Sequence, residues 1–121
     1  MALRGPGRRA VGEWGEGQAA AYLTALGWEV LERNWRCSAG EVDLVVRDPG
    51  GTVVLVEVKT RSGLGYGTPL EAITWAKQAK LRELAMHYRR SHAGVGRVRV
   101  DAIGVLRDGQ SVRISHVRAL S

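Results

Sequence analysis

The stretch that decides the fold is "VVLVEVKTR", residues 53–61, which is apolar until an acid and a base appear two positions apart. Side chains alternate across a β-strand, so the valines at even positions fill one face, while two apolar residues followed by Glu57 and Lys59 fill the other. Because both faces begin apolar, the stretch predicts an interior strand that is covered on both sides. Glu57 and Lys59 then either form an exposed ion pair where the strand leaves the core or belong to a functional site.

The length and composition favour one compact domain. The chain has 121 residues, of which 45% are hydrophobic, and this is enough for a single core. We expect a basic, flexible leader over residues 1–11 and one domain over residues 12–121. The leader lacks the apolar stretch of a secretory signal, and no run approaches the ~20 apolar residues that span a bilayer. Because Cys37 is the single cysteine, no internal disulfide can form, and we expect a cytoplasmic location without membrane attachment.

The charge of the chain favours an anionic partner. Eighteen Lys and Arg residues stand against twelve Asp and Glu, which gives a formal net charge of +6. Such an excess is typical of proteins that bind nucleic acid, although many small basic domains do not. We therefore expect nucleic acid as the partner.

The order of the predicted elements is αβββαββ, which indicates an α/β domain with a mixed central sheet flanked by helices. The turn residues "PGG" join the second and third strands into a hairpin, and "GLGYG", residues 63–67, predicts a mobile loop at the mouth of a site. The predicted helices cover residues 12–26 and 69–91, and the predicted strands cover 28–34, 41–48, 52–59, 96–107 and 111–117.

The predicted hairpin brings two acids together. If residues 49–51 form a three-residue loop, Asp43 lies opposite Glu57, and Glu41 lies opposite Lys59. Directly opposed carboxylates repel each other, so a purely structural role does not explain the pair, whereas a bound divalent cation does. The alternative is that both side chains bend out to water at the edge of the sheet.

Each predicted helix carries a charged residue on its apolar stripe. Glu16 falls among the apolar positions of the first helix, where it either serves a site or is stabilised by the helix dipole. Lys77 lies in the middle of the core stripe of the second helix, where it either serves the site or extends its ammonium to solvent. Lys80 lies at the edge of that stripe and faces solvent or phosphate.

These residues carry a resemblance to a known group of proteins. An Asp at position 43, followed after thirteen residues by Glu57-Val58-Lys59, resembles the active-site signature of the PD-(D/E)XK nuclease superfamily. The ordered blocks "GEWGEGQAAAYLTALGWEVLERNWR", "GEVDLVV", "VEVKTR", "GTPLEAI" and "RVDAIGV" resemble the YraN-like family of small bacterial predicted endonucleases. The resemblance runs from about Gly12 to Val117.

The resemblance implies a restriction-endonuclease-like fold that is similar to Holliday-junction resolvases. It implies a metal-dependent endonuclease in which Asp43, Glu57 and Glu16 hold Mg²⁺ or Mn²⁺ and Lys59 completes the catalytic set. The substrate it implies is nucleic acid, with DNA favoured over RNA and branched or single-stranded DNA favoured over plain duplex, and a homodimer would suit paired cuts. The auxiliary or nucleic-acid-binding residues that we expect are Glu41, Arg61, Lys77 and Lys80.

Two other interpretations stay open at this point. The chain could be a non-catalytic nucleic-acid-binding module that keeps the nuclease fold, or a structural protein whose acids form ion pairs. Asp101 is expected to be structural or a neighbour of the metal ligands rather than a ligand itself. No zinc site is predicted, because the three histidines, His87, His92 and His116, show no metal-ligand spacing with Cys37.

Overall fold

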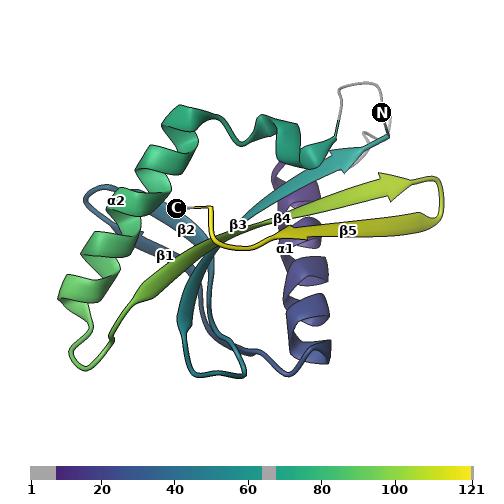
Figure 1. The fold of residues 1–121 in the computed structure, drawn as a ribbon. Coiled ribbons are helices and arrows are strands. Elements are labelled where there is room, and N and C mark those ends of the chain that lie inside the picture. The colour runs from purple at the N-terminus through teal and green to yellow at the C-terminus, as the bar shows by residue number, and fades with distance from the viewer. Residues whose placement is uncertain (1–7, 64–67, 121) are drawn as a thin grey trace.

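The computed structural model describes residues 8–63 and 68–120. The α/β class and the order αβββαββ are confirmed, with one short 3₁₀ helix added before the second α-helix (Figure 1). The elements are α1 (Arg8–Ala25), β1 (Glu29–Cys37), β2 (Gly40–Arg47), β3 (Val53–Ser62), η1 (Pro69–Ala72), α2 (Trp75–Ser91), β4 (Val98–Asp108) and β5 (Ser111–Val117).

The five strands form one mixed sheet in the order β1-β2-β3-β4-β5. Three neighbouring pairs are antiparallel, and β3 and β4 are parallel because η1 and α2 carry the chain back between them. β3 occupies the centre of the sheet, so the prediction of an interior strand is confirmed.

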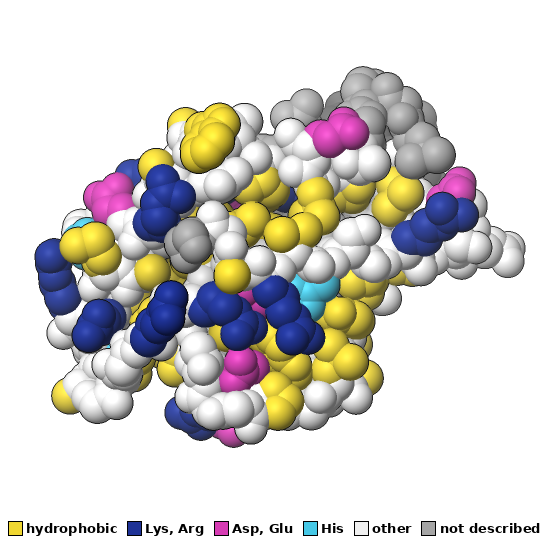
Figure 2. All heavy atoms as spheres, in the orientation of Figure 1, with side chains coloured by type: hydrophobic (Ala, Val, Ile, Leu, Met, Phe, Trp, Pro, Cys, Tyr) yellow, Lys and Arg dark blue, Asp and Glu magenta, His cyan; other side chains and the backbone are white. Residues whose placement is uncertain are grey.

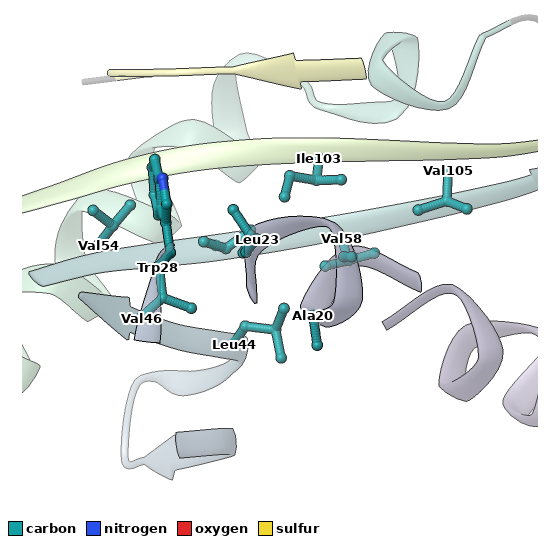
Figure 3. Close-up of a cluster of buried hydrophobic side chains, with 11 residues drawn as sticks. Ala20, Leu23, Trp28, Leu44, Val46, Val54, Val58, Ile103 and Val105 are labelled. Carbon is teal, nitrogen blue, oxygen red and sulfur yellow. The ribbon is translucent and has the colours of Figure 1, made fainter. Parts of the chain in front are cut away.

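The two apolar faces of β3 are buried by different helices. Val54, Val56 and Val58 pack with Ala20 and Leu23 of α1, in the cluster drawn in Figure 3. The opposite face of the strand packs with the buried side chains of α2, in a second cluster that contains Val53, Leu55, Leu81, Leu84 and Tyr88. Full burial of each such aliphatic side chain contributes about 1.5–3 kcal/mol, so both helices are held firmly on the sheet.

Helix α1 begins and ends differently from the prediction. It starts at Arg8, so residues 8–11, which were expected in the leader, belong to the helix, and residues 1–7 lie outside the described residues. It ends in a Schellman motif, in which Trp28 N donates to Leu23 O and Gly27 has a φ of 86°. This turn sends Trp28 into the core and leaves Leu26, the last residue of the predicted helix, 45% exposed.

The predicted helix over residues 69–91 is interrupted. Its first residues form η1, and α2 begins only at Trp75, because the side chain of Thr74 accepts a hydrogen bond from Lys77 N and caps the new helix. Helix η1 packs directly on β4, where a Cβ at Gly104 would lie 3.0 Å from Pro69 Cβ. Residues 64–67 of the predicted mobile loop lie outside the described residues.

The hairpin has the predicted register but opens earlier than predicted. β2 pairs with β3 from Arg47 opposite Val53 to Leu44 opposite Val56. One further step places Asp43 opposite Glu57, but beyond it β2 stays paired with β1 alone. The prediction that Glu41 faces Lys59 is therefore wrong, because position 41 lies past the fork. Glu41 pairs with Arg36 of β1, and its neighbour Val42 joins the α2 cluster.

Candidate active site

A pocket of about 570 Å³ lies where β2 parts from β3, between the first turns of α1 and α2. It is strongly polar, and it collects most of the predicted site residues. Its lining includes Glu16, Glu41, Asp43, Glu57 and Lys77, together with Arg9, Gly12, Glu13, Asn34 and Arg36.

Asp43 sits at the fork of the two strands. Its Oδ2 accepts a hydrogen bond of 2.8 Å from Val58 N, so the carboxylate takes the place of a ladder partner that β2 no longer supplies. Burial, and after it the negative charge of Glu57, raise the pKa of Asp43 to about 7, although the Val58 hydrogen bond opposes this change. The ionised form of Asp43 is thus less favoured than that of an ordinary aspartate.

Glu57 is the most buried of the site acids, with 4% of its surface exposed. Its Oε1 lies 3.1 Å from Lys77 Nζ and 3.6 Å from Lys59 Nζ. A buried carboxylate needs such partners, because an unpaired buried charge is costly. The ion pair with Glu57 also explains why Lys77 lies on the core stripe of α2. Lys77 lines the pocket, whereas Lys59 does not.

Glu16 reaches the pocket because α1 approaches β3 very closely. A Cβ at Gly15 would collide with the side chain of Thr60, so only glycine permits this contact. Burial, and then the charges of Glu41 and Glu13, raise the pKa of Glu16. The helix-stripe prediction therefore located this acid correctly.

Asn34 is a pocket residue that the sequence did not single out. Its φ is 52°, a left-handed conformation that Asn tolerates better than most residues. With its amide nitrogen turned toward the acids, it donates to Glu16 Oε1 at 3.0 Å and to Glu41 Oε1 at 3.1 Å. Glu41 is also paired with Arg36 at 3.0 Å, so α1, β1 and β2 are tied together here. The sequence signal that could have identified Asn34 is a polar residue at the end of the predicted strand over residues 28–34.

Two predicted auxiliary residues are not brought to the pocket. Arg61 lies further along β3, where its Nη1 donates to Thr60 O at 3.3 Å and its buried Nε has no hydrogen-bond partner among the described residues. Lys80 pairs with Glu83 one turn along α2, at 3.3 Å. Neither residue lines the pocket.

Within residues 8–63 and 68–120, no three His, Cys, Asp or Glu side chains are grouped closely enough to hold a metal ion by themselves. The histidines that were considered for zinc have other contacts: His92 lies 3.5 Å from Glu32, and His116 lies 2.8 Å from Asp101. In the same described ranges, no helix has the length and apolarity needed to cross a membrane.

Asp101 on β4 is the centre of a second, separate acid cluster. It is fully buried and accepts hydrogen bonds from Arg99, from His116 and from the backbone N of Ala119. Arg99 also reaches Asp48 in the hairpin turn at 3.0 Å. These partners tie β4, β5 and the hairpin together. Asp101 is therefore structural, which was one of the two roles expected for it from the sequence.

Comparison with known proteins places the chain in a family. The model of the family described as "Uncharacterised protein family UPF0102" matches residues 15–105. This chain belongs to UPF0102. A UPF0102 protein of Beutenbergia cavernae is 50% identical over 113 residues, covering 92% of this chain and 95% of its own length. One from Nocardioides sp. is 48% identical over 116 residues, covering 93% and 92% respectively. The matched region contains Glu16, Asp43, Glu57, Lys59 and Lys77.

A solved structure described as an EndoMS-dsDNA2 complex matches 91% of this UPF0102 chain with a TM-score of 0.48 and 15% sequence identity. The chain spans 42% of the length of that protein.

Proposed function

We propose that this UPF0102 protein is a metal-dependent endonuclease that hydrolyses phosphodiester bonds in nucleic acid. The observation that carries the proposal is the acid pair at the fork of β2 and β3. Asp43 is hydrogen-bonded to the backbone N of Val58, the residue after Glu57, and the pKa of Asp43 is raised to about 7 by burial and by Glu57. The two carboxylates repel each other, and a bound cation that neutralises both explains why they lie so close together.

The donor set suits Mg²⁺ or Mn²⁺. Hard cations take oxygen ligands, and Mg²⁺ keeps several waters while binding one or two carboxylates and the phosphates of a substrate. Asp43 and Glu57 supply such a pair, and Glu16 lines the same pocket. A full protein cage of three acids is not needed, which fits the absence of a three-residue group in the described ranges.

The chain's own groups have separable roles in this proposal. When bound, the divalent ion supplies an activated water and stabilises charge on the phosphate. Asp43 and Glu57 would hold the ion, and the hydrogen bond from Val58 N keeps the Asp43 carboxylate in place. Lys59 and Lys77, which flank Glu57, stabilise the negative charge that develops on the phosphate and orient the attacking water.

The net charge of +6 supports a nucleic-acid substrate held mainly through its backbone. We propose DNA with branched or single-stranded segments as the substrate. A cytoplasmic location and a two-fold dimer for paired cuts remain predictions that follow from this function.

The second candidate is a binding module that no longer cleaves. One observation favours it: Glu57 is already paired with two lysines, so a metal ion must compete with Lys77 for the same carboxylate. Metal binding at Asp43 would not distinguish the two candidates, but turnover would.

The test combines cleavage with metal binding. We expect the protein to cut at least one member of a labelled panel of duplex, single-stranded, flapped and four-way DNA in Mg²⁺ or Mn²⁺. Asp43→Asn and Lys59→Ala should each lower the rate at least about 100-fold. Asp43→Asn should also weaken Mn²⁺ binding measured by calorimetry, whereas Lys59→Ala should retain it. Arg47→Ala removes a charge from an exposed pair with Glu29 outside the pocket and should cut like the wild type.

Absence of cleavage across the whole panel, with Mn²⁺ still bound at Asp43, would favour the binding module. Unchanged Mn²⁺ affinity in Asp43→Asn would show that the proposed metal site is wrong.

A further inference from the structure

The outward face of α2 carries an exposed stripe of aromatic, thioether and arginine side chains. Trp75, Arg82 and Arg89 are spaced by seven residues, or two helical turns, so they lie above one another, and Met86 falls beside them. Trp75 is 82% exposed and Met86 is 55% exposed, which is unusual for such large apolar side chains. We refer to Trp75, Arg82, Met86 and Arg89 as the α2 stripe.

The C-terminal half of the α2 stripe borders a groove of about 300 Å³ between α2 and the start of β4. Arg82, Met86 and Arg89 form one wall, and Arg97 forms the other. The floor includes Val98 and Val100 and is apolar. Figure 2 shows this face of the molecule, where Lys and Arg side chains gather over α2 and the neighbouring strand.

The arginines of this groove have no acidic partner in the described part of the chain. Two other exposed cations are paired: Arg47 lies 3.3 Å from Glu29, and Lys80 lies 3.3 Å from Glu83, the one acid of α2. Arg82, Arg89 and Arg97 therefore keep uncompensated positive charge beside an apolar floor. A ligand that complements this surface is a polyanion with apolar, flat groups.

We propose that single-stranded nucleic acid binds along the α2 stripe, with a base stacked on Trp75 and phosphates contacting Arg82, Arg89 and Arg97. Exposed bases stack on aromatic side chains, whereas the paired bases of a duplex have no free face to offer. From Trp75 to Arg89 the helix rises about 21 Å, which is enough for several nucleotides.

The α2 stripe also predicts which substrates are cleaved. Only this prediction about cleavage rests on the proposed function. Trp75 opens α2, and two residues later Lys77 reaches Glu57 in the acid pocket. Lys77 projects from the side of the helix opposite Trp75, so a strand bound on the stripe reaches the pocket by passing around the N-terminus of α2. We therefore expect the substrates to be nucleic acids with a single-stranded arm rather than continuous duplex.

Binding is tested with the full protein and a fluorescent oligothymidylate of about 20 nucleotides, in chelator, so that cleavage does not affect the result. We expect Trp75→Ala to weaken binding about ten-fold and Trp75→Phe to retain most of it. Saturating oligonucleotide should quench tryptophan fluorescence in the wild type, and most of this quenching should vanish in Trp75→Ala.

The charge contribution has a matched control. The double variant Arg89→Ser with Arg97→Ser should weaken binding and lower the slope of log affinity against log salt by about 1.4, which corresponds to two lost phosphate contacts. The double variant Arg47→Ser with Arg113→Ser removes the same charge from exposed positions off the groove, and it should bind almost like the wild type.

Several outcomes would overturn the inference. Equal losses in the two double variants would mean that diffuse charge, not the groove, binds the strand. Duplex that binds as tightly as the oligonucleotide, with no effect of Trp75→Ala, would exclude stacking. Sedimentation showing a dimer that Trp75→Ala dissociates would make the stripe an interface between copies, and tighter binding of polyglutamate would indicate a protein partner. Tight binding without any cleavage in metal would leave this inference intact while removing the proposed function.

Discussion

Two acids on neighbouring parts of the sheet, one fully buried and the other partly buried, have opposite surroundings. Asp101 pairs in register with Val56, and Glu57, the partner of Asp43, is the next residue along β3. Asp101 is enclosed by donors: Arg99, His116 and the Ala119 backbone all hydrogen-bond to it. Asp43 has one donor, Val58 N, and faces a second carboxylate.

The difference appears in the pKa values. Burial tends to raise the pKa of Asp101, but the hydrogen bonds from Arg99, Ala119 and His116 outweigh it and hold that pKa below its ordinary value. Burial raises the pKa of Asp43 as well, and there the charge of Glu57 adds to the effect instead of opposing it. The same residue type thus stabilises the fold at one position and is held with a raised pKa beside a second carboxylate at the other.

The largest expected effect is on the free energy of unfolding when each of the two acids is replaced by Asn. Asp101→Asn should lower the free energy of unfolding by about 3–5 kcal/mol, because it breaks a buried charge network and leaves Arg99 without its main partner. Urea denaturation of the metal-free protein measures the loss.

Asp43→Asn is the matched change, and it should be neutral or stabilising in the same assay, because it removes repulsion from Glu57. The contrast between the acids fails if Asp43→Asn destabilises the protein as much as Asp101→Asn does.

A smaller effect tests whether the pocket depends on how close α1 lies to β3. Gly15→Ala should destabilise the protein by about 1–3 kcal/mol and move Glu16, because the new methyl group collides with Thr60. Gly17→Ala, two residues along the same helix, meets nothing within 4 Å and should stabilise the protein by up to about 1 kcal/mol. Thermal unfolding compares them, and equal shifts in both variants would show that the close approach at Gly15 is unimportant.

The smallest effect concerns pH. Because the pKa of Asp43 is about 7 in the folded protein and near 3.8 in the unfolded chain, the folded state binds the extra proton between these values. The contribution of Asp43 to stability is therefore present at low pH and is lost as the pH rises toward about 7. As the pH rises from about 5 to about 8 in chelator, the free energy of unfolding of Asp43→Asn should increase relative to that of the wild type, on the order of 1 kcal/mol.

Urea denaturation of both proteins at the two pH values measures this gain. A difference between wild type and variant that stays constant across this range would mean that Asp43 ionises normally. Saturating Mn²⁺ should reduce the gain, because the cation favours ionised Asp43 in the wild type.

The sequence by itself determined the parts of this protein that depend on local pattern. Alternation along residues 53–58 identified a strand buried on both faces, and the short loop at residues 49–51 placed Asp43 opposite Glu57. Helical periodicity likewise placed Glu16 and Lys77 toward the site. These results need only the geometry of one strand, one turn or one helix, which neighbouring residues fix.

Only the tertiary structure decided where those elements part and meet. The fork after Leu44 depends on β1 holding β2 while Val58 N turns to Asp43, and no single strand contains that information. The bridging position of Asn34 and the partners of Asp101 join segments far apart in the chain, as does the contact of Lys77 with Glu57. Such contacts are fixed when the helices pack on the sheet, because the burial of whole faces, rather than local propensity, sets their positions.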